Sequence, residues 1–210
     1  MIAAQFVVAG ISRQQTILDL CAAPGGKTTY MAQIAPKHTF IAVDRSKTRL
    51  EKIQQHLIQL DLSNVKLVHN TVSQFVQTHP NMKVKRILLD PPCSALGLRP
   101  RLSCNIDSKS ILSLAKYQLR MLKKASTLLG SSGYLVYSTC TITHEENEGN
   151  IKLLMDENRY EEPVVLPLDE LKNNTVEEIL MKYKNGVTLR FDPTIHGTPG
   201  YFIAVLKKKK

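Results

Sequence analysis

The chain has 210 residues, enough for one domain with a substantial core, and its formal charge of +10 favours a polyanionic partner over an inert basic surface. No apolar run approaches the roughly 20 residues of a membrane span, so we expect an intracellular protein without a membrane partner, in the cytoplasm, with the nucleus and the mitochondrion as open alternatives. The four cysteines include no CxxC pair and no Cys/His cluster with zinc spacing, which argues against a disulfide framework and against a metal site.

The predicted elements alternate between strand and helix along most of the chain. The opening segment, 1–10, is expected to pack as a helix or strand against the rest. Hydrophobic patterning predicts strands at 17–20, 40–43, 65–68, 87–89 and 134–137, with Gly133 opening the last of these, and helices at 27–35, 46–60, 109–129 and 145–158. Two further strands, 187–191 and 201–206, are expected to pair antiparallel. This order predicts a doubly wound, mostly parallel α/β sheet of seven strands that ends in an antiparallel strand.

Ligands of such sheets bind beyond the carboxyl ends of the strands, so the loops that begin at 21, 44, 70, 90 and 138 are candidate sites. The first loop, Cys21 to Thr28, contains small residues that admit a ligand close to the backbone, followed by a helix N-terminus. Its Gly-Lys-Thr is not a P-loop, because Cys21 stands where that motif needs glycine. A purely structural turn is the alternative.

Three of the other loops also begin with reactive or charged side chains. Asp44 can accept hydrogen bonds from ribose hydroxyls, or can simply cap a helix. Asp90-Pro91-Pro92-Cys93 aims an acid and a thiol through a rigid turn. Cys140 ends the neighbouring strand, where a lone cysteine would normally be core packing. Two cysteines at the ends of adjacent strands instead indicate a nucleophilic thiolate.

The segments LDLCAAPGGKT, DPPCSALGLRP and YSTCTITHEENE resemble, in this order, the signature motifs of the Sun/Fmu-type (RsmB-like) RNA 5-methylcytosine methyltransferases. The closing segment 190–204 is similar to the family's last strands, so the resemblance covers about 16 to 206. It implies a Rossmann-like methyltransferase sheet, S-adenosylmethionine as cofactor and RNA as substrate, with tRNA the first candidate and rRNA the second. The Arg-Pro after the cysteine motif resembles the subgroup that acts on the acceptor end of tRNA.

The resemblance also implies roles for individual residues. Cys140 would attack carbon 6 of cytosine, which activates carbon 5 for methylation, and Cys93 would assist proton removal or product release. Asp90 would bind the N3 edge of the base, and Lys27 would stabilise the thiolate. An analogy with DNA cytosine methyltransferases would instead make Cys93 the nucleophile, and chemistry alone does not decide between the two.

The resemblance implies that residues of the first four loops hold the cofactor. Those expected to contact it are Cys21, Ala22, Ala23, Pro24, Gly25, Gly26, Lys27, Asp44, Arg45, Asn70 and Asp90. The family usually has an aspartate after the third strand, where this chain has Asn70, whose side-chain oxygen or the backbone would substitute.

Family members also carry substantial sequence before the first motif, whereas about 16 residues precede it here. We therefore expect 1–210 to be a single catalytic domain without the N-terminal RNA-binding region, which folds and holds cofactor but methylates full-length RNA poorly. A basic strip of Arg99, Arg101, Lys109, Lys116 and Lys123 is expected to contact phosphates, with a solvated helix face as the alternative for its lysines. Two other functions remain open: an RNA-binding protein with a decayed cofactor site, and a small-molecule methyltransferase or other nucleotide-binding enzyme.

Overall fold

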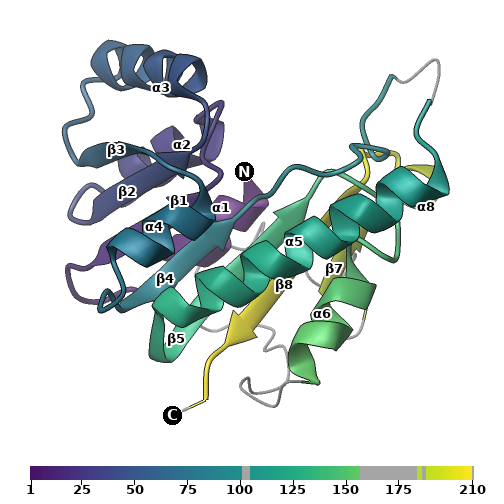
Figure 1. Ribbon diagram of the computed structural model, residues 1–210. Coiled ribbons are helices and arrows are strands. Elements are labelled where there is room, and N and C mark those ends of the chain that lie inside the picture. The colour runs from purple at the N-terminus through teal and green to yellow at the C-terminus, as the bar shows by residue number, and fades with distance from the viewer. Residues whose placement is uncertain (101–104, 157–183, 186–187, 210) are drawn as a thin grey trace.

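The computed structural model describes residues 1–100, 105–156, 184–185 and 188–209, and it contains one eight-stranded sheet (Figure 1). The strand order is β3-β2-β1-β4-β5-β8-β7-β6. The bounds of the strands are β1 Thr16–Leu20, β2 Thr39–Asp44, β3 Val65–His69, β4 Val84–Leu89, β5 Leu129–Thr139, β6 Lys184–Asn185, β7 Thr188–Phe191 and β8 Tyr201–Lys207. Strands β1 to β5 pair in parallel, and β8 is antiparallel to both β5 and β7.

Helices cover both faces of this sheet, as expected of a doubly wound fold. The helices are α1 Ile2–Val8, α2 Gly26–Ile34, α3 Lys47–Gln59, α4 Val72–Thr78, α5 Ser108–Leu128, α6 Glu148–Met155 and α8 Pro193–His196. Alternate residues of each strand point to opposite faces, so Phe40 and Ala42 of β2 pack towards α1, α2 and α3, while Val43 packs towards α4, α5 and α6. None of the helices in the described part of the chain has the length and apolarity needed to cross a bilayer.

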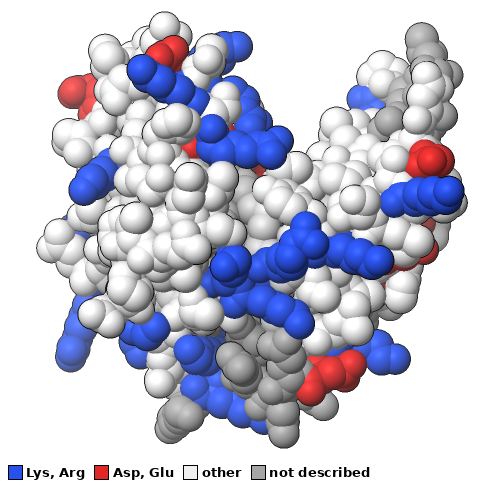
Figure 2. All heavy atoms as spheres, in the orientation of Figure 1, with Lys and Arg blue, Asp and Glu red and all other residues white. Residues whose placement is uncertain are grey.

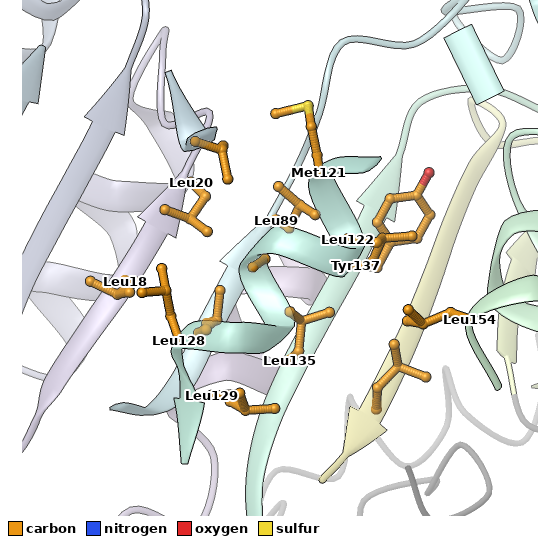
Figure 3. Close-up of a cluster of buried hydrophobic side chains, with 14 of the residues drawn as sticks. Leu18, Leu20, Leu89, Met121, Leu122, Leu128, Leu129, Leu135, Tyr137 and Leu154 are labelled. Carbon is orange, nitrogen blue, oxygen red and sulfur yellow. The ribbon is translucent and has the colours of Figure 1, made fainter. Parts of the chain in front are cut away.

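The larger core lies between the sheet and the layer of α4, α5 and α6 (Figure 3). Leu122 and Leu128 of α5 are fully buried against Leu89 of β4 and Leu135 of β5. Burial of a leucine side chain stabilises the fold by about 1.5–3 kcal/mol. This packing fixes α5 across β4 and β5, the two strands that carry the DPPC and STC segments at their carboxyl ends.

The predicted mostly parallel sheet with an antiparallel C-terminal strand is confirmed, and the two-residue β6 adds an eighth strand to the seven expected. Three details were wrong. Strand β5 begins at Leu129 rather than after Gly133, with a register shift opposite Val84–Arg86. Helix α6 begins at Glu148 rather than 145, because 144–147 form a turn held by side-chain hydrogen bonds. Helix α4 was not predicted, because it has only seven residues, too few for the i, i+3 spacing of its two buried residues, Val72 and Phe75, to establish a helical period.

Candidate active site

The loop after β1 is held tightly against β2 and the start of α2. The amides of Cys21 and Ala22 both donate to the Val43 carbonyl, at 2.9 and 3.0 Å. Gly25, the N-cap of α2, has φ 104°, and a Cβ there would lie 2.8 Å from a side-chain carbon of Ile53. Glycine is therefore required for both the left-handed backbone and the close approach of α3. The small residues of this segment thus serve the fold as well as exposing backbone to a ligand.

Asp44, at the end of β2, connects this loop to the start of α3. Its carboxylate accepts hydrogen bonds from the amides of Ala23 (3.1 Å) and Ser46 (2.9 Å), and the Arg49 guanidinium lies 3.3 Å away. A carboxylate has about four acceptor sites, so at least one remains for a ligand hydroxyl. Because the Arg49 side chain is 44% exposed, a ligand can displace it and free a second site.

A cavity, here called the α5 cavity, opens at the carboxyl ends of β1, β2 and β4. Its predicted lining residues are Cys21, Ala23, Asp44, Arg45, Asn70, Asp90, Cys93 and Cys140. Eight further lining residues were not among the predicted site residues: Val43, Arg49, Thr71, Val72, Pro91, Pro92, Tyr117 and Met121. Tyr117 and Met121 are four residues apart on α5 and therefore lie on the same face of this helix. The sequence does not show which face of α5 lines the cavity, because that depends on how the helix packs on the sheet.

The other predicted residues of the first loop line a second cavity on the opposite side of that loop, here called the α1 cavity. Those residues are Ala22, Pro24, Gly25, Gly26 and Lys27. Its wall also includes residues of the N-terminal segment and α1, of β1 and of the β7–β8 region: Met1, Ile2, Asp19, Phe191, Thr198, Pro199 and Tyr201. Cys21, Ala23 and Asp90 line both cavities, so ligands bound in the two would meet at this point.

Asp90 is bound by two groups from different elements. The Lys27 ammonium lies 2.5 Å from Oδ2, and the Ser138 hydroxyl donates to Oδ1 at 3.0 Å. Burial alone would lower the pKa of Lys27, but the Asp90 carboxylate and Tyr201 outweigh it and raise that pKa, so Lys27 stays charged. Burial and Asp90 also raise the pKa of Tyr201, to about 12. The cation lies 5.7 Å from the centre of the Tyr201 ring.

The two cysteines are brought together as predicted, with Sγ–Sγ 3.3 Å. The hydrogen bond from Cys93 lowers the pKa of Cys140, and Lys27 acts in the same direction, whereas burial and Asp90 oppose it. The same hydrogen bond, together with burial, raises the pKa of Cys93. The pair therefore favours a Cys140 thiolate that accepts a hydrogen bond from a Cys93 thiol, and thiolates are the nucleophilic form.

Asp19, on β1 beneath the site, is a buried acid that the sequence analysis did not single out. Its side chain accepts a 2.6 Å hydrogen bond from the Thr28 hydroxyl. Burial, with the neighbouring Asp90 and Asp44, raises the pKa of Asp19 to about 7 despite that hydrogen bond. An aspartate in an unfolded chain titrates near 3.9.

We therefore expect the protonated Asp19 to make the fold depend on pH. Between about pH 4 and 7 the folded state holds a proton that the unfolded state lacks, so the free energy of unfolding falls as the pH rises, by about 4 kcal/mol from this group. The side chain in Asp19→Asn stays neutral at every pH. Between about pH 4 and 7 the free energy of unfolding of this variant, measured by urea titration, should therefore fall by about 4 kcal/mol less than that of the wild type. Asp61→Asn, at an exposed position, is the control. Parallel curves for wild type and Asp19→Asn would contradict the assignment.

Basic side chains extend away from the site along α5. This helix carries five Lys or Arg residues and no Asp or Glu, and Lys109, Lys116 and Lys123 are exposed. In Figure 2 blue side chains cross the middle of the molecule along α5. Arg99 is also exposed, whereas Arg101 lies outside the described residues. Phosphate binding by this strip stays a prediction.

Comparison with known proteins agrees with the motifs and the fold. A family described as "16S rRNA methyltransferase RsmB/F" matches residues 8–207. The tRNA (cytosine(72)-C(5))-methyltransferase of Pyrococcus horikoshii is 39% identical over 197 residues, covering 92% of this chain and 47% of that protein. The human 28S rRNA (cytosine(4447)-C(5))-methyltransferase is 35% identical over 204 residues, covering 92% of this chain and 25% of that protein.

The solved structure of NSun6 from Pyrococcus horikoshii with SFG superposes with a TM-score of 0.82 at 36% identity, over 100% of this chain and 51% of that one. This chain thus spans half or less of the length of these relatives. The family resemblance of the three motifs is confirmed, and the chain belongs to the 16S rRNA methyltransferase RsmB/F family.

Proposed function

We propose that this chain transfers a methyl group from S-adenosylmethionine to carbon 5 of a cytosine in RNA. The observation that carries the proposal is the Cys93–Cys140 pair in the α5 cavity beside the Asp90–Lys27 pair, of which Asp90 lines both cavities. A thiolate next to an acid and a cation suits addition to carbon 6 of a pyrimidine. The names of two relatives, one acting on tRNA and one on 28S rRNA, make tRNA the first substrate to test and rRNA the second.

The donor set of the α5 cavity fits S-adenosylmethionine, which supplies an electrophilic methyl group when bound. Asp44 would accept ribose hydroxyls, and Asn70 and Arg45 would border the adenosine. The Cys21–Ala23 backbone would lie along the methionine portion. A methyl donor held in this cavity would meet a base that enters through the α1 cavity, reaches Asp90, which lines both cavities, and extends to the Cys93–Cys140 pair, which lines the α5 cavity.

In the proposed reaction, Asp90 takes the proton of the Cys140 thiol and passes it to N3 of the base while Cys140 Sγ bonds to carbon 6. Carbon 5 then takes the methyl group and loses its proton to water with the assistance of Cys93. N3 returns its proton to Asp90 as the bond from carbon 6 to Cys140 breaks and releases the thiolate. Lys27 holds Asp90 in place and favours the Cys140 thiolate. Either sulfur of the 3.3 Å pair can donate its proton to the other, so the alternative role, Cys93 as nucleophile, is tested by the alanine variants of the two cysteines.

The proposal is tested by incubating the chain with S-adenosylmethionine labelled in its methyl group and either tRNA or rRNA transcripts, then identifying the labelled nucleoside. We expect label only in 5-methylcytidine. Label in another nucleoside would overturn the proposed reaction. Cofactor and RNA binding without any transfer would favour the RNA-binding alternative.

Asp44→Asn should weaken cofactor binding, because hydrogen bonds to a charged acceptor contribute about 1.5–3 kcal/mol. We expect the calorimetric Kd for S-adenosylmethionine to rise roughly 10- to 100-fold. Glu51→Gln, at an exposed position of α3, is the control and should leave the Kd unchanged. Equal affinity in Asp44→Asn and wild type would remove Asp44 from the cofactor site.

A further inference from the structure

Glu146 is a fully buried carboxylate, 0% exposed, in the turn between β5 and α6. Its Oε1 accepts hydrogen bonds from the Ser94 amide (2.9 Å) and the Gln118 amide group (2.8 Å). Its Oε2 accepts from the Ser94 hydroxyl (2.5 Å) and the Thr143 hydroxyl (2.7 Å). These four donors fill the acceptor sites of an ionised carboxylate, which accounts for its burial.

The donors come from both cysteine loops. Ser94 directly follows Cys93, and Thr143 lies three residues after Cys140. The Ser94 and Thr141 hydroxyls are also 2.6 Å apart. A hydroxyl has one proton to donate, so if Ser94 gives its proton to Glu146, Thr141 must donate to Ser94. The residues that follow the two cysteines are thus joined to each other and to the same carboxylate.

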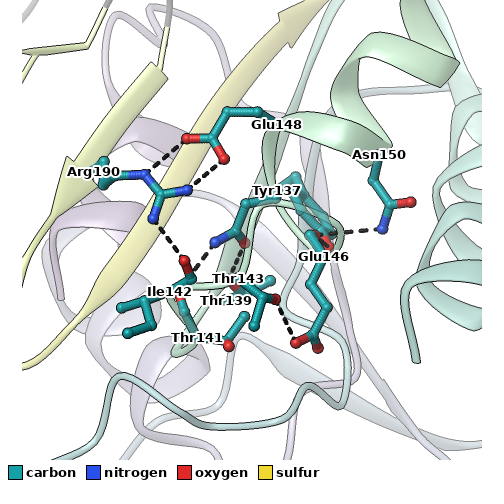
Figure 4. Close-up of polar contacts among 10 residues, drawn as sticks. Tyr137, Thr139, Thr141, Ile142, Thr143, Glu146, Glu148, Asn150 and Arg190 are labelled. Atoms are coloured by element: carbon teal, nitrogen blue, oxygen red, sulfur yellow. Dashed lines mark hydrogen bonds and ion pairs between the residues drawn. The ribbon is translucent and has the colours of Figure 1, made fainter. Parts of the chain in front are cut away.

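Further contacts hold the Cys140 loop to its surroundings. The Gly97 amide donates to the Cys140 carbonyl at 3.0 Å, which joins the two loops a second time. The Asn147 amide group donates to the Thr141 carbonyl at 3.1 Å, and Arg190 donates to the Ile142 carbonyl at 2.9 Å (Figure 4). Of the side chains in these contacts, only Glu146 binds both cysteine loops and α5, through Ser94, Thr143 and Gln118.

We propose that Glu146 is a positioning residue that fixes the Cys93 loop against the Cys140 loop and so sets the distance between the two sulfurs. The inference rests on the proposed function for its catalytic consequence, but not for its geometry. Glu146 touches neither cysteine sulfur in the structure. It acts through Ser94 and Thr143, and its effect should fall on the chemical step rather than on cofactor binding.

Glu146→Gln keeps the size of the side chain but replaces one acceptor oxygen with an NH2 group. If that NH2 faces the Ser94 backbone amide and the Gln118 NH2, both of those hydrogen bonds are lost. If it faces the Ser94 and Thr143 hydroxyls, these can accept instead, but the Ser94–Thr141 contact must then reverse its donor and all four contacts lose the charge of the carboxylate. The matched control is Glu145→Gln, the same substitution one position earlier on an exposed side chain. Thr141→Val breaks the hydroxyl contact between the loops without touching Glu146, whereas Ser94→Ala breaks the same contact and also removes one of the four donors to the carboxylate.

Two measurements test the proposal. The first is kcat for RNA methylation together with the Kd for S-adenosylmethionine. We expect Glu146→Gln to lower kcat at least 10-fold with an unchanged Kd, Ser94→Ala and Thr141→Val to lower it several-fold, and Glu145→Gln to match wild type. Wild-type kcat in Glu146→Gln would overturn the proposal. So would a fall in kcat matched by an equal loss of cofactor binding, which indicates general damage to the fold.

The second measurement does not depend on RNA methylation. Hydrogen peroxide oxidises two thiols to a disulfide and is itself reduced to two waters, and the rate of Cys93–Cys140 disulfide formation, followed by mass spectrometry of peptides, reports how closely the sulfurs are held. We expect this rate to fall at least 10-fold in Glu146→Gln and to be unchanged in Glu145→Gln. If Glu146→Gln does not fold, Ser94→Ala and Thr141→Val decide the matter, and wild-type oxidation rates in both would overturn the proposal. A slowed rate in an enzyme that methylates no RNA would contradict the proposed function alone.

Discussion

Replacing Cys140 with alanine is expected to abolish methyl transfer while the protein still folds and binds cofactor. The reaction needs a nucleophile on carbon 6, and loss of a catalytic nucleophile typically costs on the order of 10⁴-fold or more in kcat. In the proposed roles the neighbouring Cys93, whose sulfur lies 3.3 Å from that of Cys140, assists proton removal and does not replace the missing nucleophile. The measurement is transfer of labelled methyl to RNA, with calorimetry for cofactor binding.

Cys93→Ala is the matched variant on the other side of the sulfur pair. It should retain nucleophilic attack but release product slowly, so a covalent complex with RNA should accumulate and be visible on a denaturing gel. Cys21→Ala, the third free cysteine among the described residues, is the control and should form no persistent complex. A persistent complex in Cys140→Ala but not in Cys93→Ala would reverse the two roles.

Asp90→Asn is expected to lower kcat roughly 100- to 10,000-fold, the usual contribution of a general acid. The amide retains the shape of the side chain but has no acidic proton to give to N3 of the base. It also ends the ion pair with Lys27, which lies 2.5 Å from the carboxylate. Steady-state kinetics on a tRNA substrate would measure the loss.

Two controls separate the acid from its ion pair. Asp61→Asn alters an exposed aspartate and should leave kcat unchanged. Lys27→Met removes the partner but leaves the acid, and should cost less than Asp90→Asn. A loss below tenfold in Asp90→Asn would exclude proton donation by this residue.

Much of the site follows from the sequence because parallel strands end at one edge of a sheet. Cys21, Asp44, Asp90 and Cys140 each follow a predicted strand, and the structure brings all four to the α5 cavity. The spacing of the motifs alone therefore located the edge where chemistry takes place. It did not show that Lys27 contacts Asp90 rather than a sulfur, because that depends on the rotation of α2.

Residues contributed by distant packing could not be predicted in this way. Tyr201, the first residue of β8, lies more than 150 residues after Lys27 in the chain. It reaches Lys27 only because β8 pairs with β5 in the sheet. Glu146 reads in sequence as one of several acidic residues of HEENE. Its burial depends on donors from three separate segments, and no local pattern encodes that convergence.

The most direct test of the account is trapping with RNA that contains 5-fluorocytidine. Fluorine on carbon 5 cannot leave as a proton does, so the reaction should stop after methyl transfer with the base still bound to the attacking sulfur. In the presence of S-adenosylmethionine we expect a covalent RNA–protein complex, with the methylated base mapped by mass spectrometry to Cys140. Methylation without any covalent complex, or a complex mapped to Cys93, would contradict the account.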